Sequence, residues 1–249
     1  MIEVNNITKR FGLIQAVRNL SFSVAAGEVF GLLGPNGAGK TTTLRILATL
    51  LKADAGTATI GGLDIVRDAE RIRTNIGVVN GGMGLYDRLS GREILHYFGK
   101  LYGMNRSAIE DRIRELDGLL ELGDTLERRA GGFSTGMKQK IVIARAVLHD
   151  PPVIFFDEAT SGLDVMARRA VLDFVGNYAS RARAVIYSTH VMSEIEELCK
   201  RVAVVYRGEL IALDRVDALR LKTGAINLEQ AFFRIIESSD QPREQVALT

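Results

Sequence analysis

An α/β fold with a mostly parallel central sheet is predicted by three short apolar runs that alternate with helical patterns. The runs are Ile76–Val79, Val153–Phe156 and Ala184–Tyr187, and they are nearly continuous in apolar residues, as strands buried on both faces of a parallel sheet are. The segments that follow the last two runs, Met166–Ala179 and Met192–Lys200, repeat apolar residues at helical spacing. This alternation indicates right-handed crossovers in an α/β sheet.

The N-terminal segment is predicted to begin an antiparallel sheet. Ile2–Val4 is expected to form one short strand, and Leu20–Val24 a second one with apolar residues at alternate positions. A turn at Ala26-Gly27 leads into Glu28–Leu33, an apolar run of strand length. Leucines at helical spacing then predict a helix over Lys40–Leu51.

Residues 83–149, which begin at Met83, interrupt the alternation of strands and helices. We expect them to form an all-helical subdomain inserted into the α/β core, because glycines link three helical patterns there: Arg92–Tyr102, Ser107–Leu122 and Gly136–Leu148. The predicted organisation is one domain over residues 1–225, which contains this insertion, and a short helix with a tail over residues 226–249.

The C-terminal part of the chain ends in short elements. Val202–Tyr206 and Glu209–Ala212 predict a hairpin with its turn at Arg207-Gly208. Asn227–Ile236 predicts a terminal helix, and the polar stretch Ser238–Thr249, which contains Pro242, is expected to fray.

The composition is that of a globular chain and excludes several classes of protein. Of its 249 residues, 47% are hydrophobic and 25% are charged, unlike a disordered or collagenous chain. Thirty-two basic and 30 acidic side chains leave a net charge of +2, so we expect no nucleic-acid partner. No apolar run approaches the about 18 residues that span a bilayer, and no signal peptide is apparent, so we expect a cytoplasmic chain. The single cysteine, Cys199, is expected to be a small buried residue.

A glycine-rich motif lies between a predicted buried strand and a predicted helix. It matches the phosphate-loop pattern G-x-x-x-x-G-K-[ST] and reads Gly34-Pro35-Asn36-Gly37-Ala38-Gly39-Lys40-Thr41. Glycines let successive backbone N–H groups point at one phosphate, and the helix N-terminus adds partial positive charge. We expect Lys40 to bind the outer phosphates, Thr41 to ligate Mg²⁺, and Thr42 to lie in the same site. The competing interpretation is a glycine-rich turn with an ordinary exposed lysine.

Two carboxylates follow the buried strand Val153–Phe156. Acids at the carboxyl end of a central strand lie in the crevice where open α/β sheets bind ligands. Asp157 is expected to hold Mg²⁺ through water, and Glu158 to orient and deprotonate an attacking water. Alternatively, both acids cap the next loop, Ala159-Thr160-Ser161, but the phosphate loop in the same chain favours the catalytic interpretation.

Four further motifs resemble those of ATP-binding-cassette (ABC) proteins. Phe133–Lys140 resembles the signature that opens a helix, and Ser161–Asp164 looks like the D-loop of the family. Ser188-Thr189-His190 resembles the switch-histidine segment, and Phe11 lies where the family stacks an aromatic ring on adenine. The motifs stand in the order of the family between Met1 and Leu213, and on them the chain is identified as a member.

The resemblance implies a P-loop NTPase core with an N-terminal antiparallel β subdomain and an inserted helical subdomain. It also implies an ATPase that uses ATP and Mg²⁺ and forms a head-to-tail dimer with a second ATPase subunit, expected to be identical. ATP would lie between the phosphate loop of one chain and the signature of the other, at Ser134, Gly136 and Asp164, with His190 hydrogen-bonded to the γ-phosphate.

Each single match has a simpler interpretation. Phe11 could be a core aromatic residue, and His190 could be a residue at a helix entry. His96 and His149 match no motif of the family, so we expect them to be surface or capping residues.

The chain departs from the family pattern at two positions. Met137 ends the signature, where glutamine is usual. Gly81 follows the strand Ile76–Val79 at a position where the family has a glutamine that touches Mg²⁺ and contacts the membrane partner. Either Asn80 or water takes over the metal contact, so no glutamine role is carried over.

Other segments resemble bacterial export cassettes of the sodium-extrusion and of the drug- or antibiotic-efflux type. They are Gly84–Ser90 with Arg92-Glu93, Ser134–Lys140 and Leu228–Phe232. This resemblance implies a multi-span membrane permease as partner and a place on the inner face of the cell membrane. Two alternatives are a soluble ABC ATPase in cofactor assembly or repair, and a regulatory nucleotide-binding module without turnover, against which Glu158 argues. The cargo stays open, because cargo contacts lie on the membrane subunits.

Overall fold

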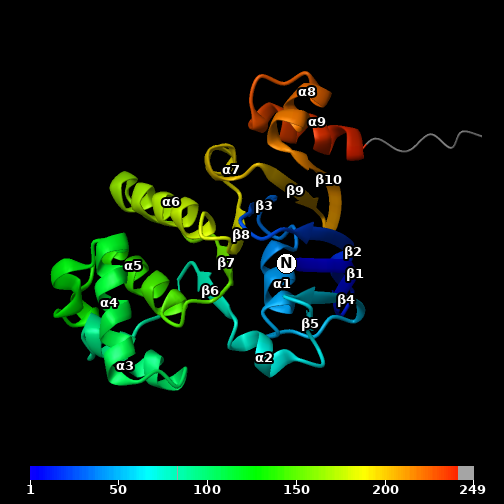
Figure 1. Cartoon of the computed structure of the whole chain (residues 1–249). Helices are drawn as coiled ribbons and strands as arrows, with labels where there is room; N and C mark the ends of the chain where they lie inside the picture. The colour runs from blue at the N-terminus through cyan, green and yellow to red at the C-terminus, as the bar shows by residue number, and fades with distance from the viewer. Residues whose placement is uncertain (83, 241–249) are drawn as a thin grey trace, which may run out of the picture.

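The computed structural model describes residues 1–82 and 84–240 of the chain (Figure 1). Its centre is a six-stranded sheet in the order β10-β9-β3-β8-β7-β6, in which only β10 runs antiparallel to its neighbour. The strands are β3 (Val29–Leu33), β6 (Ile76–Asn80), β7 (Val153–Asp157), β8 (Ala184–Thr189), β9 (Arg201–Tyr206) and β10 (Glu209–Arg215). The predicted α/β fold with a mostly parallel sheet is confirmed.

The central strands are apolar because both of their faces are buried. Every residue of β3, β7 and β8 is buried. Alternate residues belong to different cores: Phe156 and Tyr187 pack with the helical insertion. Phe155 and Ile186 pack with the N-terminal strands and with α1 (Lys40–Leu47) on the other face. A continuous apolar run is therefore the pattern that this sheet requires.

The N-terminal strands form a separate antiparallel sheet in the order β2-β1-β4-β5. β1 spans Ile2–Phe11 and β2 spans Ile14–Val24, so both strands are longer than predicted. β4 (Ala55–Ile60) and β5 (Leu63–Asp64) were not predicted, because the first three residues of β4 are exposed and give no alternating pattern. Pairing with β1, in which Ile60 lies opposite Ile2, places this strand in the sheet.

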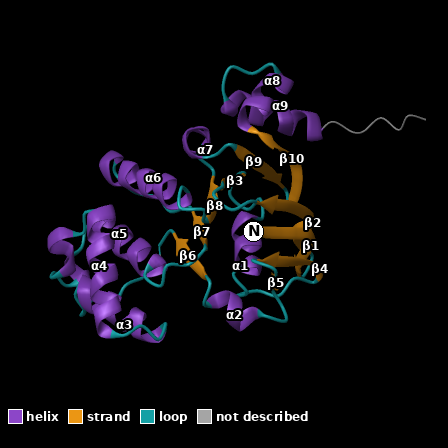
Figure 2. Ribbon diagram, viewed as in Figure 1, coloured by secondary structure: helices purple, strands orange, loops and turns teal. Residues whose placement is uncertain are grey.

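The predicted helical insertion is present as three helices and two short 3₁₀ segments. The helices are α3 (Gly91–Leu101), α4 (Arg106–Leu120) and α5 (Thr135–Val147). They lie together on the opposite side of the molecule from the antiparallel strands (Figures 1 and 2). Side chains cap each helix start, as Ser90, Asn105 and Ser134 accept a hydrogen bond from a backbone N–H of the first turn. The expected first residue of this insertion, Met83, lies outside the described residues.

The remaining helices cover the sheet and the C-terminal end. They are α2 (Ala69–Arg73), α6 (Val165–Ala179), α7 (Met192–Leu198), α8 (Val216–Thr223) and α9 (Leu228–Asp240). α2 and α8 were not predicted. α9 continues through Ser238, where fraying was expected, and residues 241–249 with Pro242 lie outside the described residues.

The structure bears on two further predictions, one about Cys199 and one about membrane-spanning segments. Cys199 is 6% exposed, as expected for a small core residue, and its burial raises the pKa of the thiol. Within the described ranges 1–82 and 84–240, no helix has the length and apolar character needed to cross a membrane.

Candidate functional site

The phosphate loop joins the buried strand β3 to helix α1. Lys40, the first residue of the helix, is 4% exposed, so the interpretation as an ordinary exposed lysine is wrong. Its Nζ donates hydrogen bonds to the backbone oxygens of Gly34, at 2.7 Å, and of Pro35, at 3.1 Å. Burial lowers the pKa of Lys40, while the nearby carboxylates of Glu158 and Asp157 oppose this shift.

Glycine is required at two positions of this loop. Gly39 has a φ of 108°, and a Cβ built there would lie 2.4 Å from the backbone oxygen of Ala16. A Cβ at Gly34 would lie 2.2 Å from the backbone oxygen of Val205. The loop therefore packs its backbone directly against β2 and β9, and any side chain at these positions would push it away.

The loop encloses a cavity of about 320 Å³. It is lined by Ala16, Asn36, Gly37, Ala38, Gly39, Lys40, Thr41, Thr42 and Glu158. Gly34 and Pro35 belong to the predicted loop but do not line the cavity. Their backbone oxygens accept hydrogen bonds from Lys40 Nζ. Ala16 was missed by sequence reasoning and could not have been found, because it lies on β2 and carries no polar side chain.

Asp157 and Glu158 lie at the carboxyl end of β7. Asp157 is 5% exposed, and its Oδ1 accepts a 3.0 Å hydrogen bond from Ser188 Oγ on the neighbouring strand β8. Glu158 Oε1 lies 3.5 Å from Lys40 Nζ and 3.3 Å from His190 Nδ1. The fold thus brings together Lys40, Glu158 and His190, which are far apart in the sequence.

The alternative in which both acids cap the following loop has no support in these contacts. The N–H of Ser161 donates to the backbone oxygen of Glu158 at 3.1 Å, so a carbonyl group closes this turn. The Glu158 backbone has a φ of 50°, in the left-handed region that costs a residue with a Cβ about 1 kcal/mol or more. The strained backbone therefore belongs to the residue whose carboxylate faces Lys40.

The oxygen donors near the phosphate loop fit the chemistry of Mg²⁺. Among residues 1–82 and 84–240, no group of three or more His, Cys, Asp or Glu side chains could hold a metal by itself. Mg²⁺ usually takes one or two protein oxygens and completes its shell with water and phosphate oxygens. The hydroxyl of Thr41, which lines the cavity, and the buried carboxylate of Asp157 match that requirement.

Phe11 ends strand β1 and is 48% exposed, so the interpretation as a core aromatic residue is wrong. Lys9 Nζ lies 5.7 Å from the centre of its ring. An exposed ring flanked by a cation can stack on a planar base. Its place beside adenine stays a prediction.

The signature and D-loop residues lie elsewhere. Ser134 caps α5, and its Oγ accepts a 3.2 Å hydrogen bond from the N–H of Met137. Asp164 caps α6 and accepts a 2.9 Å hydrogen bond from the N–H of Ala167. A Cβ at Gly136 would lie 3.0 Å from the Cβ of Ala167, so the two helix starts touch. Neither Ser134, Gly136 nor Asp164 lines the cavity of the phosphate loop.

The structure explains why Gly81 stands where glutamine was expected. Its N–H donates to the backbone oxygen of Asp157 at 2.9 Å, and a Cβ there would lie 2.7 Å from the backbone oxygen of Glu158. A larger residue at this position would displace Glu158. Asn80 lies opposite Asp157 in the pairing of β6 with β7, and its metal contact stays a prediction.

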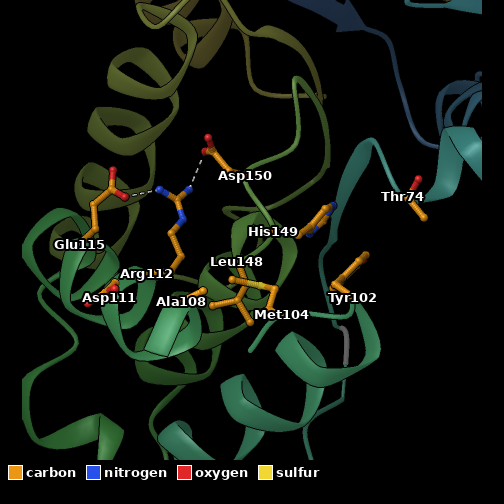
Figure 3. A pocket seen from close by; sticks show the side chains of 10 residues that line it. All are labelled: Thr74, Tyr102, Met104, Ala108, Asp111, Arg112, Glu115, Leu148, His149 and Asp150. Atoms are coloured by element: carbon orange, nitrogen blue, oxygen red, sulfur yellow. Dashed lines mark hydrogen bonds and ion pairs between the residues drawn. The ribbon is translucent and has the colours of Figure 1, made fainter. Parts of the chain in front are cut away.

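A second cavity, of about 530 Å³, lies between α4 and the chain that enters β7 (Figure 3). Arg112 crosses it and donates hydrogen bonds to the backbone oxygen of Val147, at 3.0 Å, and to Asp150 Oδ1, at 2.9 Å. The ring of His149 stacks on Tyr102, with the ring centres 3.7 Å apart. These contacts hold α4, the end of α5 and the segment after α3 next to the chain that enters β7.

The two remaining histidines were expected on the surface or at helix caps, and this was wrong. His149 is half-buried, and its Nε2 lies 3.1 Å from the backbone oxygen of Ile76. His96 is half-buried as well, and its Nε2 lies 2.6 Å from Glu110 Oε1. His96 joins α3 to α4, and His149 joins the segment before β7 to the start of β6.

The stability of the fold is expected to fall when His149 is protonated. Burial lowers the pKa of His149 from 6.5 to about 4. A depressed pKa in the folded state stabilises the protein above pH 6.5, and this contribution is lost as the pH falls from 6.5 towards 4. In urea unfolding, the stability of the parent relative to His149→Phe, which keeps the stack on Tyr102, should therefore fall as the pH is lowered from 6.5 towards 4. A constant difference would contradict the assignment.

Comparisons with known proteins agree with these motifs. The profile of the family described as ABC transporter matches residues 17–161. The ABC transporter ATP-binding protein NatA of Bacillus subtilis (strain 168) is 42% identical over 224 residues, which cover 88% of this chain and 91% of that one. The doxorubicin resistance ATP-binding protein DrrA of Mycobacterium tuberculosis (strain CDC 1551 / Oshkosh) is 38% identical over 225 residues, 90% of this chain and 68% of that one.

Solved structures of the same kind share the fold. An ATP-binding subunit of an ABC transporter superposes with a TM-score of 0.87 and 27% identity over 95% of this chain and 99% of the other. A dimeric bacterial ABC transporter cassette has a TM-score of 0.78 and 25% identity over 86% of this chain and 98% of the other. The same cassette was also solved as a dimer in a post-hydrolysis state bound to ADP and phosphate.

Proposed function

Because this chain belongs to the ABC transporter family, we propose that it is the ATP-hydrolysing subunit of an export system and powers a membrane permease. The observation that carries the proposal is the convergence of Lys40, Glu158 and His190 at the phosphate-loop cavity. Relatives whose names refer to drug resistance support export. Sodium ion, drug or antibiotic are the candidate cargoes.

The side chains suggest how ATP is bound. Lys40 exchanges the carbonyl oxygens of Gly34 and Pro35 for the outer phosphates, which are stronger acceptors because they carry charge. Gly37 to Thr41 line the phosphate site at the start of α1, where the helix N-terminus favours an anion. Phe11 stacks on adenine from the end of β1. Thr41 and Asp157 would hold Mg²⁺, which would neutralise part of the phosphate charge.

Hydrolysis then depends on two side chains that already lie near each other. Glu158 accepts a proton from the attacking water, since its carboxylate is placed beside Lys40 at the edge of the cavity. His190, 3.3 Å from Glu158 Oε1, hydrogen-bonds the γ-phosphate. The positions of both side chains are set by the ends of β7 and β8, which are hydrogen-bonded neighbours in the sheet.

The signature and D-loop residues are proposed to serve the ATP of a partner chain. Ser134 and Gly136 lie at the start of α5, Asp164 lies at the start of α6, and none of the three faces the chain's own cavity. In a head-to-tail dimer of two identical subunits they contact the ATP of the other chain. A related cassette that was solved as a dimer supports this arrangement.

A charge placed on the signature is expected to block the dimer without harming the monomer. Thr135 is the exposed first residue of α5, where a carboxylate favours the helix dipole, so Thr135→Asp should fold normally. The same carboxylate repels the γ-phosphate of the partner's ATP, so ATP-driven dimerisation and turnover should fall about tenfold or more. Size-exclusion chromatography and phosphate release measure both effects.

Thr135→Asn is the matched control, because asparagine has the size of aspartate without its charge. This variant should dimerise like the parent. ATP affinity of the isolated Thr135→Asp monomer should equal that of the parent. A large loss of affinity there would show that the signature acts within its own chain.

The permease partner can be tested directly. We expect the tagged chain, expressed with its neighbouring genes, to co-purify from detergent-solubilised membranes with a multi-span protein, which places it on the inner face of the cell membrane. The loop Gly84–Ser90 after β6 is proposed to make that contact. Purification without such a protein would instead favour an ABC ATPase in cofactor assembly or repair.

We propose one ATPase domain over residues 1–225, which contains the helical subdomain over about residues 83–149. Residues 226–249 are proposed as a C-terminal addition to that domain, and its helix α9 contacts α8, α7 and β10.

A further inference from the structure

Glu194, on the first turn of α7, has a carboxylate that is 1% exposed. Its Oε1 accepts a 2.7 Å hydrogen bond from Thr160 Oγ1, and its Oε2 accepts hydrogen bonds from Thr189 Oγ1, at 2.8 Å, and from the Tyr187 hydroxyl, at 3.1 Å. Arg168 Nε lies 3.0 Å from Oε1. A buried carboxylate is tolerated only when it is paired and hydrogen-bonded in this way.

Two of these donors belong to the segments that carry the proposed hydrolytic side chains. Thr160 is the second residue after Glu158. Thr189 is the residue immediately before His190, and its hydroxyl also accepts a 3.0 Å hydrogen bond from the N–H of Val191. The buried carboxylate therefore connects the loop after β7 to the loop after β8 at the point where their side chains meet.

The backbone of the first of these loops needs such support. Glu158 has a φ of 50°, a conformation that persists only when the surrounding contacts enforce it. Its N–H donates to the backbone oxygen of Ser188 at 2.9 Å, which fixes one end of the turn. The hydrogen bond from Thr160 to Glu194 fixes the other end.

We propose that Glu194 is a positioning residue for ATP hydrolysis, which sets the separation of Glu158 and His190 by holding Thr160 and Thr189 together. The inference rests on the proposed function and deepens it. Glu194 does not line the phosphate-loop cavity, so it acts through these neighbours and not on ATP. Its loss should therefore lower the turnover number and leave ATP affinity unchanged.

Hydroxyl deletions test this with little change of shape. Thr160→Val and Thr189→Val each remove one hydrogen bond to the carboxylate, and Glu194→Gln places an NH₂ group against one pair of donors. We expect kcat for ATP to fall about tenfold or more in all three, while the Kd for ATP stays within about twofold, as for an interaction made only in the transition state. Thr160→Ser and Thr189→Ser keep the hydroxyl and should restore kcat.

Tyr178→Phe is the matched control for a merely structural role. Tyr178 is 4% exposed and donates a 2.7 Å hydrogen bond to the backbone oxygen of Pro151, at the amino end of β7. This substitution removes an equally buried hydroxyl far from Glu158, so the melting temperature should fall comparably with no change in kcat. Should Glu194→Gln fail to fold, the two valine variants decide the question.

The outcomes separate this inference from the proposed function. A parent chain that hydrolyses no ATP overturns both. A parent that hydrolyses ATP, with valine variants that melt earlier but keep the parental kcat, overturns the positioning role alone. A loss of ATP affinity in proportion to kcat does the same, because it would place Glu194 in nucleotide binding.

Discussion

Glu158→Gln is expected to abolish ATP turnover while ATP still binds. The amide has the shape of the carboxylate but cannot accept the proton of the attacking water, and general base catalysis contributes about 10²- to 10⁴-fold to a rate. Lys40 and the loop glycines that bind the phosphates are unchanged. With ATP and Mg²⁺ present, the variant should therefore accumulate as a dimer on size-exclusion chromatography, because the γ-phosphate that joins the two chains is never removed.

Glu229→Gln provides the control for this experiment. Glu229 is exposed on α9, so the same chemical change there should leave turnover and dimerisation at the parental level. If Glu158→Gln hydrolyses ATP at the parental rate and stays monomeric, another group is the catalytic base.

Lys40→Ala is expected to lose ATP binding and turnover together, by about a hundredfold or more, because the cation at the β- and γ-phosphates is removed. The structure also predicts a cost in stability. The ammonium is buried and donates to two loop carbonyls, and an unsatisfied buried acceptor costs about 1–3 kcal/mol. Isothermal titration with ATP measures the first effect, and urea unfolding measures the second.

Lys40→Met fills a similar volume without the charge and without the donors, so it should lose ATP binding to the same extent and leave the oxygens of Gly34 and Pro35 unsatisfied as well. Lys52→Ala, at an exposed position, should change neither property. Parental ATP affinity in Lys40→Met would exclude the phosphate-loop assignment.

Local patterns were sufficient for the elements that carry the site. β3, β7 and β8 were predicted because strands buried on both faces must be apolar throughout, and this requirement is visible in four or five consecutive residues. The phosphate loop was found because its glycines and its lysine lie within eight residues of each other. Apolar residues at helical spacing placed the start of α5 at Gly136, one residue from its observed start at Thr135.

Elements that depend on distant partners were missed. β4 has exposed residues over its first half and becomes a strand because β1 offers an edge for pairing. α8 is short, and only Val216 and Leu219 of its residues are buried, so its apolar pattern is too brief to identify. Chain periodicity reports which face of a segment is buried, but it does not report which segment covers that face.

The geometry of the site also depends on contacts between segments that are distant in the sequence. The contact of Lys40 with Glu158, the approach of Gly81 to the backbone of Glu158, and the hydrogen bond from Thr160 to Glu194 all join segments that follow different strands. Each depends on the strand order β3-β8-β7-β6 in the sheet, a neighbour order that no local spacing encodes. The residue types that can bind and hydrolyse ATP are therefore readable along the chain. The distances between them are set by strand order, because only the folded sheet brings the ends of β7 and β8 together.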